Sequence, residues 1–201
     1  MIPQLAPMKE LENSVYKTAR ARFIAARRLE SRQVSLVRFI IVLTLVQLVI
    51  STSLLIYNSP HAALVSVLSI TVSLLIAIVS NSEPVSKDVL HAHLLHKCGM
   101  DLMSLYRKIR AASDSSNFDK YSKEYDNILI NCIINHDPVD FNLSECLADK
   151  DKKEICPLLK IWHRVRYWIK TYEAFLFYAA LTSILCFIAY FFLFSNNFPR
   201  Q

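Results

Sequence analysis

Three uncharged apolar runs constrain this chain more than any other feature of its sequence. They extend from Phe39 to Tyr57, from Ala62 to Val79 and from Ala174 to Phe194, and contain 19, 18 and 21 residues. At about 1.5 Å of helical rise per residue, such runs approach or match the roughly 30 Å core of a bilayer. Small soluble domains rarely contain three helices that are apolar on every side, so the runs predict membrane spans rather than core helices.

Glycine is nearly absent, because Gly99 is the single glycine among 201 residues. Phosphate-cradling loops, Rossmann turns and nucleophile elbows all need backbone conformations that only glycine adopts cheaply, so these classes of site are excluded. No alternating strand pattern stands outside the apolar runs. We therefore expect an all-α integral membrane protein.

The chain also lacks a recognisable catalytic or metal-binding set. Its five cysteines form no CxxC pair and are expected to be reduced thiols. His91, His93 and His96 lie close together in sequence, but only His93 and His96 share a helical face, and no carboxylate completes a zinc site. No Ser/His/Asp or Cys/His set is arguable either. We expect no enzyme activity, no metal and no cofactor.

Charge and hydropathy divide the chain into five parts. These are a cytosolic basic helical arm (1–38), a transmembrane hairpin (39–80), a cytosolic helical domain (81–156), a basic collar helix continuing into a third transmembrane helix (157–195), and a short external tail (196–201). The arm has no Gly or Pro from Lys9 to Arg38, which predicts one helix running directly into the first span. That stretch holds eight basic and three acidic residues, so the positive-inside rule places the N-terminus in the cytoplasm.

Shorter elements follow from local signals. The two prolines of residues 1–8 predict a disordered tip, and the uncharged turn Asn58 to His61 predicts a tight connection between spans one and two. Helices are predicted over Val85–Ala112 and Phe118–Asn135, with Asp137-Pro138 ending the second and Pro157 opening the last. Residues 113–117 break the first of these helices, and residues 149–154 form a charged turn.

A polar stripe runs along the first span. Thr44, Gln47 and Ser51 share one helical face, and Ser66, Ser69 and Ser73 form a similar stripe on the second span. Since polar groups facing lipid are costly, both stripes are expected to face protein or water. For the serines, close helix packing is the simpler interpretation. The larger amide of Gln47 needs a partner on a neighbouring helix or a hydrated lumen, and we predict Thr44, Gln47 and Ser51 to be pore-lining.

Two basic clusters are candidate ligand sites. One lies on the arm and the other in the collar before the third span; together they supply the predicted ligand-binding residues Lys17, Arg20, Arg27, Arg28, Arg32, Arg164 and Arg166. Such clusters bind the phosphates of nucleotides or oligonucleotides, and they equally bind anionic lipid headgroups. The sequence leaves both interpretations open.

The order of these parts resembles a known family. The stretch Tyr16 to Leu29 (YKTARARFIAARRL) before a two-span hairpin, Tyr125-Asp-Asn-Ile-Leu in the helical domain, and then Asn135-His136 and Asp140 are similar to the SLATT family, in its subset with an additional C-terminal transmembrane helix. Ile134 stands where that family often has an acidic residue before the Asn-His pair.

The resemblance implies a function and partners. SLATT proteins are bacterial membrane effectors encoded beside nucleotide-synthesising enzymes in antiphage defence systems. By resemblance, this chain is expected to be a homo-oligomeric pore in the bacterial inner membrane, controlled by a nucleotide or oligonucleotide from a partner nucleotidyltransferase-type enzyme. Opening the pore would depolarise the membrane and stop growth. The alternative is a membrane scaffold that recruits a cytosolic partner without conducting ions. A transporter fits less well, because no discontinuous helix is predicted.

Overall fold

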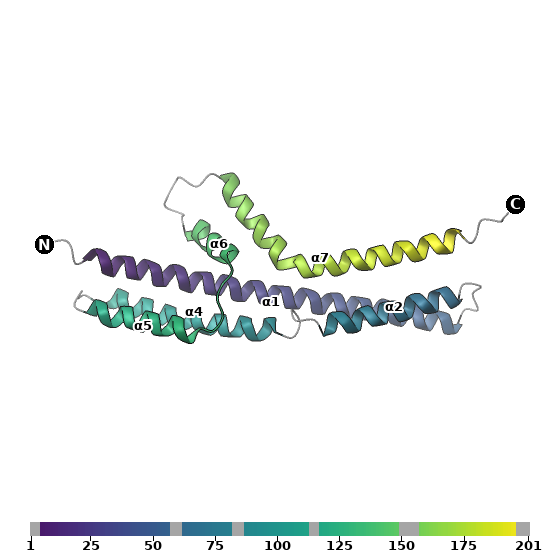
Figure 1. Cartoon of the computed structure of the whole chain (residues 1–201), viewed down its shortest axis with the longest axis horizontal. Coiled ribbons are helices and arrows are strands. Elements are labelled where there is room, and N and C mark those ends of the chain that lie inside the picture. The colour runs from purple at the N-terminus through teal and green to yellow at the C-terminus, as the bar shows by residue number, and fades with distance from the viewer. Residues whose placement is uncertain (1–4, 57–61, 82–86, 113–116, 149–156, 196–201) are drawn as a thin grey trace. The chain divides into compact units, whose positions relative to one another are not determined.

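The structure, a computed structural model, describes residues 5–56, 62–81, 87–112, 117–148 and 157–195 (Figure 1). Within these ranges the chain forms six helices and no strand, which confirms the all-α prediction. The helices are α1 (Leu5–Ile56), α2 (Ala62–Ser80), α4 (Asp88–Ala111), α5 (Phe118–Asn131), α6 (Pro138–Ala148) and α7 (Pro157–Ser195).

The helices belong to two compact units. The arm unit contains residues 1–30 and 88–171, and the span unit contains residues 31–87 and 172–201. Helix α1 is continuous from the arm into the first apolar run, as the sequence predicts. It begins at Leu5, so the predicted disordered tip is wrong from that residue onward, because Pro7 is tolerated in the first turn of a helix.

The arm unit is held by a stripe of small and aliphatic side chains on α1. Leu11, Val15 and Ala19 recur every fourth residue and are buried against α4, whose Leu102 and Leu105 are fully inaccessible. Tyrosine and isoleucine side chains of α5 close this core from the other side. The first unit is thus a small helical domain in which the arm is a core element.

The single glycine marks the closest approach between α1 and α4. A Cβ atom at Gly99 would stand 3.0 to 3.1 Å from three ring carbons of Phe23 on α1. The Phe23 ring also packs edge-on against His96, with centroids 5.3 Å apart. Gly99 therefore serves helix packing, since any side chain there would displace the Phe23 ring.

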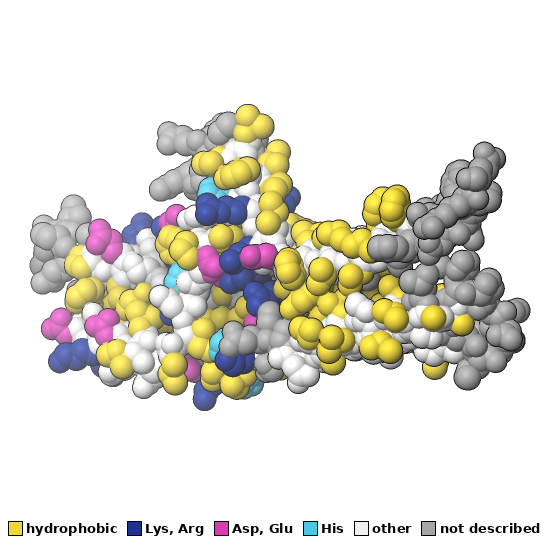
Figure 2. Space-filling model, turned by 45° about the vertical axis from the view of Figure 1, so that its right-hand side comes forward, with side chains coloured by type: hydrophobic (Ala, Val, Ile, Leu, Met, Phe, Trp, Pro, Cys, Tyr) yellow, Lys and Arg dark blue, Asp and Glu magenta, His cyan; other side chains and the backbone are white. Residues whose placement is uncertain are grey.

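The span unit is a packing of three apolar helices. Leu43 of α1 and Leu75 and Val79 of α2 are buried, and Tyr178 and Leu181 of α7 pack against them. Most other aliphatic side chains in these helices are exposed, and hydrophobic side chains dominate the surface drawn over this unit in Figure 2. A unit that is apolar both in its thin core and on its exterior suits a lipid bilayer rather than water.

Two helices in the described residues are long and apolar enough to cross a membrane. They lie within Pro7–Thr52 of α1 and Leu158–Ile188 of α7, whereas the described apolar part of α2, Val65–Ser80, is shorter. The first and third predicted spans therefore have the required length in the structure. The span in α2 and the orientation of the chain stay predictions.

One helix, α6, is not predicted from the sequence, and several predicted helix boundaries are wrong. Helix α5 ends at Asn131 rather than Asn135, and Asp137-Pro138 opens α6 instead of ending a helix. The predicted helix from Val85 to Ala112 is α4, Asp88–Ala111, in the described residues. The predicted connection at 58–61, the charged turn at 149–154 and the tail at 196–201 lie outside the described residues, as do residues 113–116 of the predicted break.

Candidate functional site: the basic arm, the polar stripe and a thiol-lined pocket

Arg28 does not reach solvent. Its Nε and one terminal nitrogen donate to the two carboxylate oxygens of Asp140 at 2.8 and 3.0 Å, and the side chains are 7% and 0% exposed. Burial opposes the charge on Arg28, but the hydrogen bonds and charge of Asp140 outweigh that effect, so the pKa of Arg28 is raised above its ordinary value. The structure brings Arg28, predicted as a ligand contact, into an internal bidentate ion pair.

The start of α6 presents Asp140 to that arginine. Asp137 is the cap, because its Oδ1 accepts the Val139 N–H at 3.2 Å, and Pro138 occupies the first helical position. A reciprocal hydrogen bond completes the cap, because Oδ2 of Asp140 accepts the Asp137 N–H at 3.2 Å. The carboxylate therefore has three hydrogen bonds and sits at the positive end of the α6 dipole.

A second contact joins the arm to the segment before α6, and His136 belongs to the same segment. Arg22 is 4% exposed and donates to the carbonyl oxygen of Ile134. The His136 ring packs on Phe141 with centroids 5.8 Å apart. Burial, followed by the positive charge of Arg22, lowers the pKa of His136 below its ordinary value, so this imidazole is neutral at pH 7.

Weaker contacts extend this docking along α1. The Thr18 and Tyr125 hydroxyls share a hydrogen bond of 3.0 Å, and Lys17 donates to Glu145 at 3.1 Å in an exposed pair. Two of the residues that carry the family resemblance, Tyr125 and Asp140, thus bind the arm.

The remaining predicted ligand residues differ in exposure. Arg27 is exposed on α1, Arg20 and Arg32 are half-buried, and Arg164 and Arg166 are exposed on α7. Trp162 and Trp168, 59% and 57% exposed, lie on the same stretch of α7 as the two collar arginines. Arg27, Arg164 and Arg166 therefore present guanidinium groups to solvent, next to aromatic surface in the case of α7.

The polar stripe of the span unit is partly paired. The Gln47 side-chain N–H donates to the Ser69 hydroxyl of α2, so the amide has a partner on a neighbouring helix. Its Oε1 is buried and has no hydrogen-bond partner in the described part of the chain. Thr44 is exposed and donates to its own helix at Ile40, 2.8 Å away, and Ser51 is half-buried.

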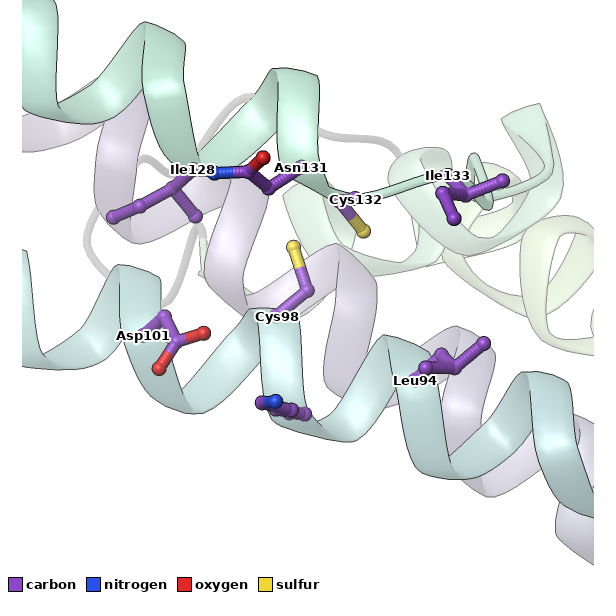
Figure 3. Close-up of a pocket in the computed structure, with 8 residues that line it drawn as sticks. Leu94, Cys98, Asp101, Ile128, Asn131, Cys132 and Ile133 are labelled. Carbon is purple, nitrogen blue, oxygen red and sulfur yellow. The ribbon is translucent and has the colours of Figure 1, made fainter.

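A pocket of about 320 Å³ lies between α4 and the end of α5. Its lining includes Leu94, Asp101 and Asn131, and Figure 3 shows the sulfur atoms of Cys98 and Cys132 pointing toward one another. Burial, followed by the contact with Cys132, raises the pKa of the Cys98 thiol to about 12. The thiol is protonated at neutral pH and is a poor nucleophile. In the described residues, no group of three or more His, Cys, Asp or Glu side chains forms a metal site.

Sequence reasoning missed the contacts to Arg22 and Arg28 and the thiol-lined pocket. The arginines join partners 112 residues away in the chain, so no local pattern on the arm reveals them. A local signal for Asp140 was present, because Asp137-Pro138-Val-Asp140 is a typical helix start with a cap, a proline at the first position and an acid at the third.

Within the described residues, the fold and these sites define an all-helical protein with long apolar helices and a docked basic arm. The chain belongs to the SLATT family: residues 5–193 match the SMODS and SLOG-associating 2TM effector domain family 5. SLATT proteins are effectors of defence systems rather than a known enzyme family. No curated protein and no solved structure matches the chain.

Proposed function

We propose that the chain is a homo-oligomeric ion-conducting effector of the bacterial inner membrane, controlled by a nucleotide or oligonucleotide from a partner nucleotidyltransferase-type enzyme. In this proposal the N-terminus is cytoplasmic and α1, α2 and α7 each cross the bilayer. Family membership supports a two-transmembrane effector with a partner enzyme.

The main support for a pore is the side-chain amide of Gln47, whose N–H has a hydrogen-bond partner and whose oxygen has none in the described residues. An amide oxygen buried in an apolar environment costs roughly 1 to 3 kcal/mol when it has no hydrogen-bond partner. Within the described residues of one copy, Oε1 has none. Neighbouring copies around a symmetry axis supply either an amide partner or a hydrated lumen, and a single three-helix unit is too thin to enclose a conduit. Thr44 and Ser51 extend the lining along α1.

Exposed arginines carry the proposed ligand control. Arg27 on the arm and Arg164 and Arg166 on α7 are exposed, which suits phosphate binding through guanidinium forks. Lys17, Arg20 and Arg32 are the other arm residues that we assign to ligand binding. Arg28 acts through Asp140 and holds the arm in place, so we assign it a positioning role in the ligand site.

The test is ion flux through liposomes that contain the purified full chain. Wild type, Gln47→Leu and a control, Thr52→Val, are compared with and without a panel of cyclic dinucleotides and short oligonucleotides. Thr52 is an exposed polar residue of the same helix, about 140° around from Gln47. We expect nucleotide-dependent flux in wild type and Thr52→Val and a changed conductance in Gln47→Leu. Absence of flux from folded, oligomeric protein under every condition rejects the pore.

A scaffold is the second candidate, and one observation favours it. Ile130, near the end of α5, and Ile133, which lines the thiol-lined pocket just after that helix, are 78% and 91% exposed. Apolar side chains this exposed suit a protein partner. The scaffold predicts that Ile133→Asp abolishes growth arrest by the defence system and that Gln47→Leu leaves it intact. The pore predicts the opposite, namely that Gln47→Leu abolishes growth arrest and that Ile133→Asp leaves it intact.

A further inference from the structure

The span unit contains a hollow of its own, which is distinct from the proposed pore-lining residues. It has a volume of about 300 Å³, lies between α1 and α7, and is lined by Ser35, Arg38, Phe39, Val42, Tyr172 and Phe175. The Phe39 and Phe175 rings pack edge-to-face with centroids 5.5 Å apart. The surface of the hollow is almost wholly apolar, so its occupant must be largely hydrocarbon.

One of the residues that line this apolar hollow, Arg38, carries a charge. Arg38 is exposed, and no salt bridge or hydrogen bond joins its guanidinium to another residue in the described part of the chain. The other polar side chain of the α1 wall is already engaged, because the Ser35 hydroxyl donates to the Ser31 carbonyl at 2.8 Å. The hollow therefore has hydrocarbon walls, and one of its lining residues ends in an exposed cationic hydrogen-bond donor.

The position of the hollow along both helices matches the membrane surface. Arg38 immediately precedes the first apolar run, and Phe175 is the second residue of the third run. Charged chain gives way to apolar chain at this level on both helices, which is where lipid headgroups lie in a bilayer. The volume is roughly twice the ~150 Å³ of an engineered protein cavity that holds one benzene. It has room for a segment of an acyl chain.

We propose that this hollow binds one anionic phospholipid of the surrounding membrane, with an acyl chain between Phe39, Val42 and Phe175 and the phosphate on Arg38. The inference rests on the membrane placement in the proposed function, but not on conduction or on a nucleotide ligand. Of the molecules that carry phosphate, only a lipid satisfies the apolar walls and the guanidinium together.

The experiment measures lipid bound to the full chain in detergent micelles by native mass spectrometry, with phosphatidylglycerol compared to phosphatidylethanolamine. Arg38→Gln removes the cation, and Val42→Trp fills the hollow. Arg110→Gln, an exposed arginine of α4, controls for the charge change, and Val46→Trp, one turn along α1 and outside the lining, controls for added bulk. Circular dichroism checks that each variant is helical to the same extent as wild type.

Wild type is expected to bind one phosphatidylglycerol per protomer in preference to phosphatidylethanolamine. Arg38→Gln should weaken phosphatidylglycerol binding about fivefold, the factor expected for one basic contact at a membrane surface, and abolish the preference. Val42→Trp should weaken both lipids, and the two controls should match wild type.

Three results overturn the proposal: unchanged phosphatidylglycerol affinity in Arg38→Gln, equal effects of Val42→Trp and Val46→Trp, or displacement of the lipid by water-soluble glycerol phosphate. The last result would show a phosphate site without an acyl-chain site. Because no step depends on ion flux, a protein that binds lipid in this pattern and conducts nothing leaves this proposal intact while the pore fails.

Discussion

The Arg28–Asp140 pair is a buried ion pair that joins the arm to α6. Both groups are withdrawn from water, so removing one partner leaves the other charged and buried. We expect Asp140→Ala to destabilise the protein by about 3 to 5 kcal/mol, whereas the double variant Arg28→Met with Asp140→Leu should recover much of the loss. Chemical denaturation followed by circular dichroism measures both. Glu145→Ala, which breaks the exposed pair with Lys17, is the control and should cost at most about 1 kcal/mol.

That arginine also shows where single-residue prediction from sequence fails. Arg27 and Arg28 are neighbours on one helix, and helical spacing gave them the same predicted role in ligand binding. In the structure Arg27 is exposed and Arg28 is 6% exposed. The difference is made by α6, which no pattern on the arm encodes. For Gln47 the sequence leaves two environments open, a partner on a neighbouring helix or a hydrated lumen, and the structure gives its side-chain N–H the Ser69 hydroxyl as a partner.

His136 gives the arm unit a pH dependence. Burial, and then the charge of Arg22, lowers its pKa in the fold, while the unfolded chain keeps a value near 6.5. Below that pH the unfolded state binds the proton first, so stability is lost as the pH falls through 6.5 toward the lower native pKa. Denaturation midpoints at pH 7.5 and 5.5 should therefore differ less in His136→Gln than in wild type. His93→Gln, on the exposed face of α4, should keep the wild-type difference; equal slopes in all three proteins would contradict the assignment.

At the scale of elements, α1 and α4 fit together through Gly99. Valine at this position is a better helix former than glycine, so a loss of stability would come from packing rather than propensity. We expect Gly99→Val to cost about 1 to 3 kcal/mol, because its side chain meets the Phe23 ring. In a Phe23→Ala background the same substitution should cost less, and this double-mutant cycle measures the contact directly. If Gly99→Val costs as much stability in the Phe23→Ala background as in wild type, the strain comes from a contact other than Phe23. Met100→Val, an exposed change on the same helix, controls for β-branching.

Most helices were predictable because their signals are local. The apolar runs and the uninterrupted arm predict α1 and α7, and the scarcity of glycine predicts a fold without strands. The sequence prediction lacks helix α6 because it ends a helix at Asp137-Pro138, although proline is also favoured at the first helical position. The contacts between elements, such as Thr18 with Tyr125 across 107 residues, had no local signal.

The whole molecule is joined by two helices that belong to both units. Helix α1 passes from the arm unit to the span unit between Glu30 and Ser31, and α7 does so between Thr171 and Tyr172. Neither helix is interrupted at the boundary. A continuous helix carries a displacement or rotation of its arm end into its membrane end, whereas a flexible linker does not. If a nucleotide acts on the arm, α1 is the direct route to Thr44, Gln47 and Ser51.

That route can be tested by lowering the helix stability of α1 at the boundary between the two units. The double variant Glu30→Gly with Ser31→Gly lowers helix stability there by about 1 to 2 kcal/mol and leaves both units their cores. Liposome flux should persist, but its ratio with and without the most effective nucleotide should fall toward one. That ratio is expected to lie between about 5 and 150 in wild type, the usual range of coupling between sites. Asn13→Gly with Ser14→Gly, two exposed positions of the same helix inside the arm unit, should keep the wild-type ratio. Equal ratios in the two double variants would mean that control reaches the pore by another path, and α7 would be softened next.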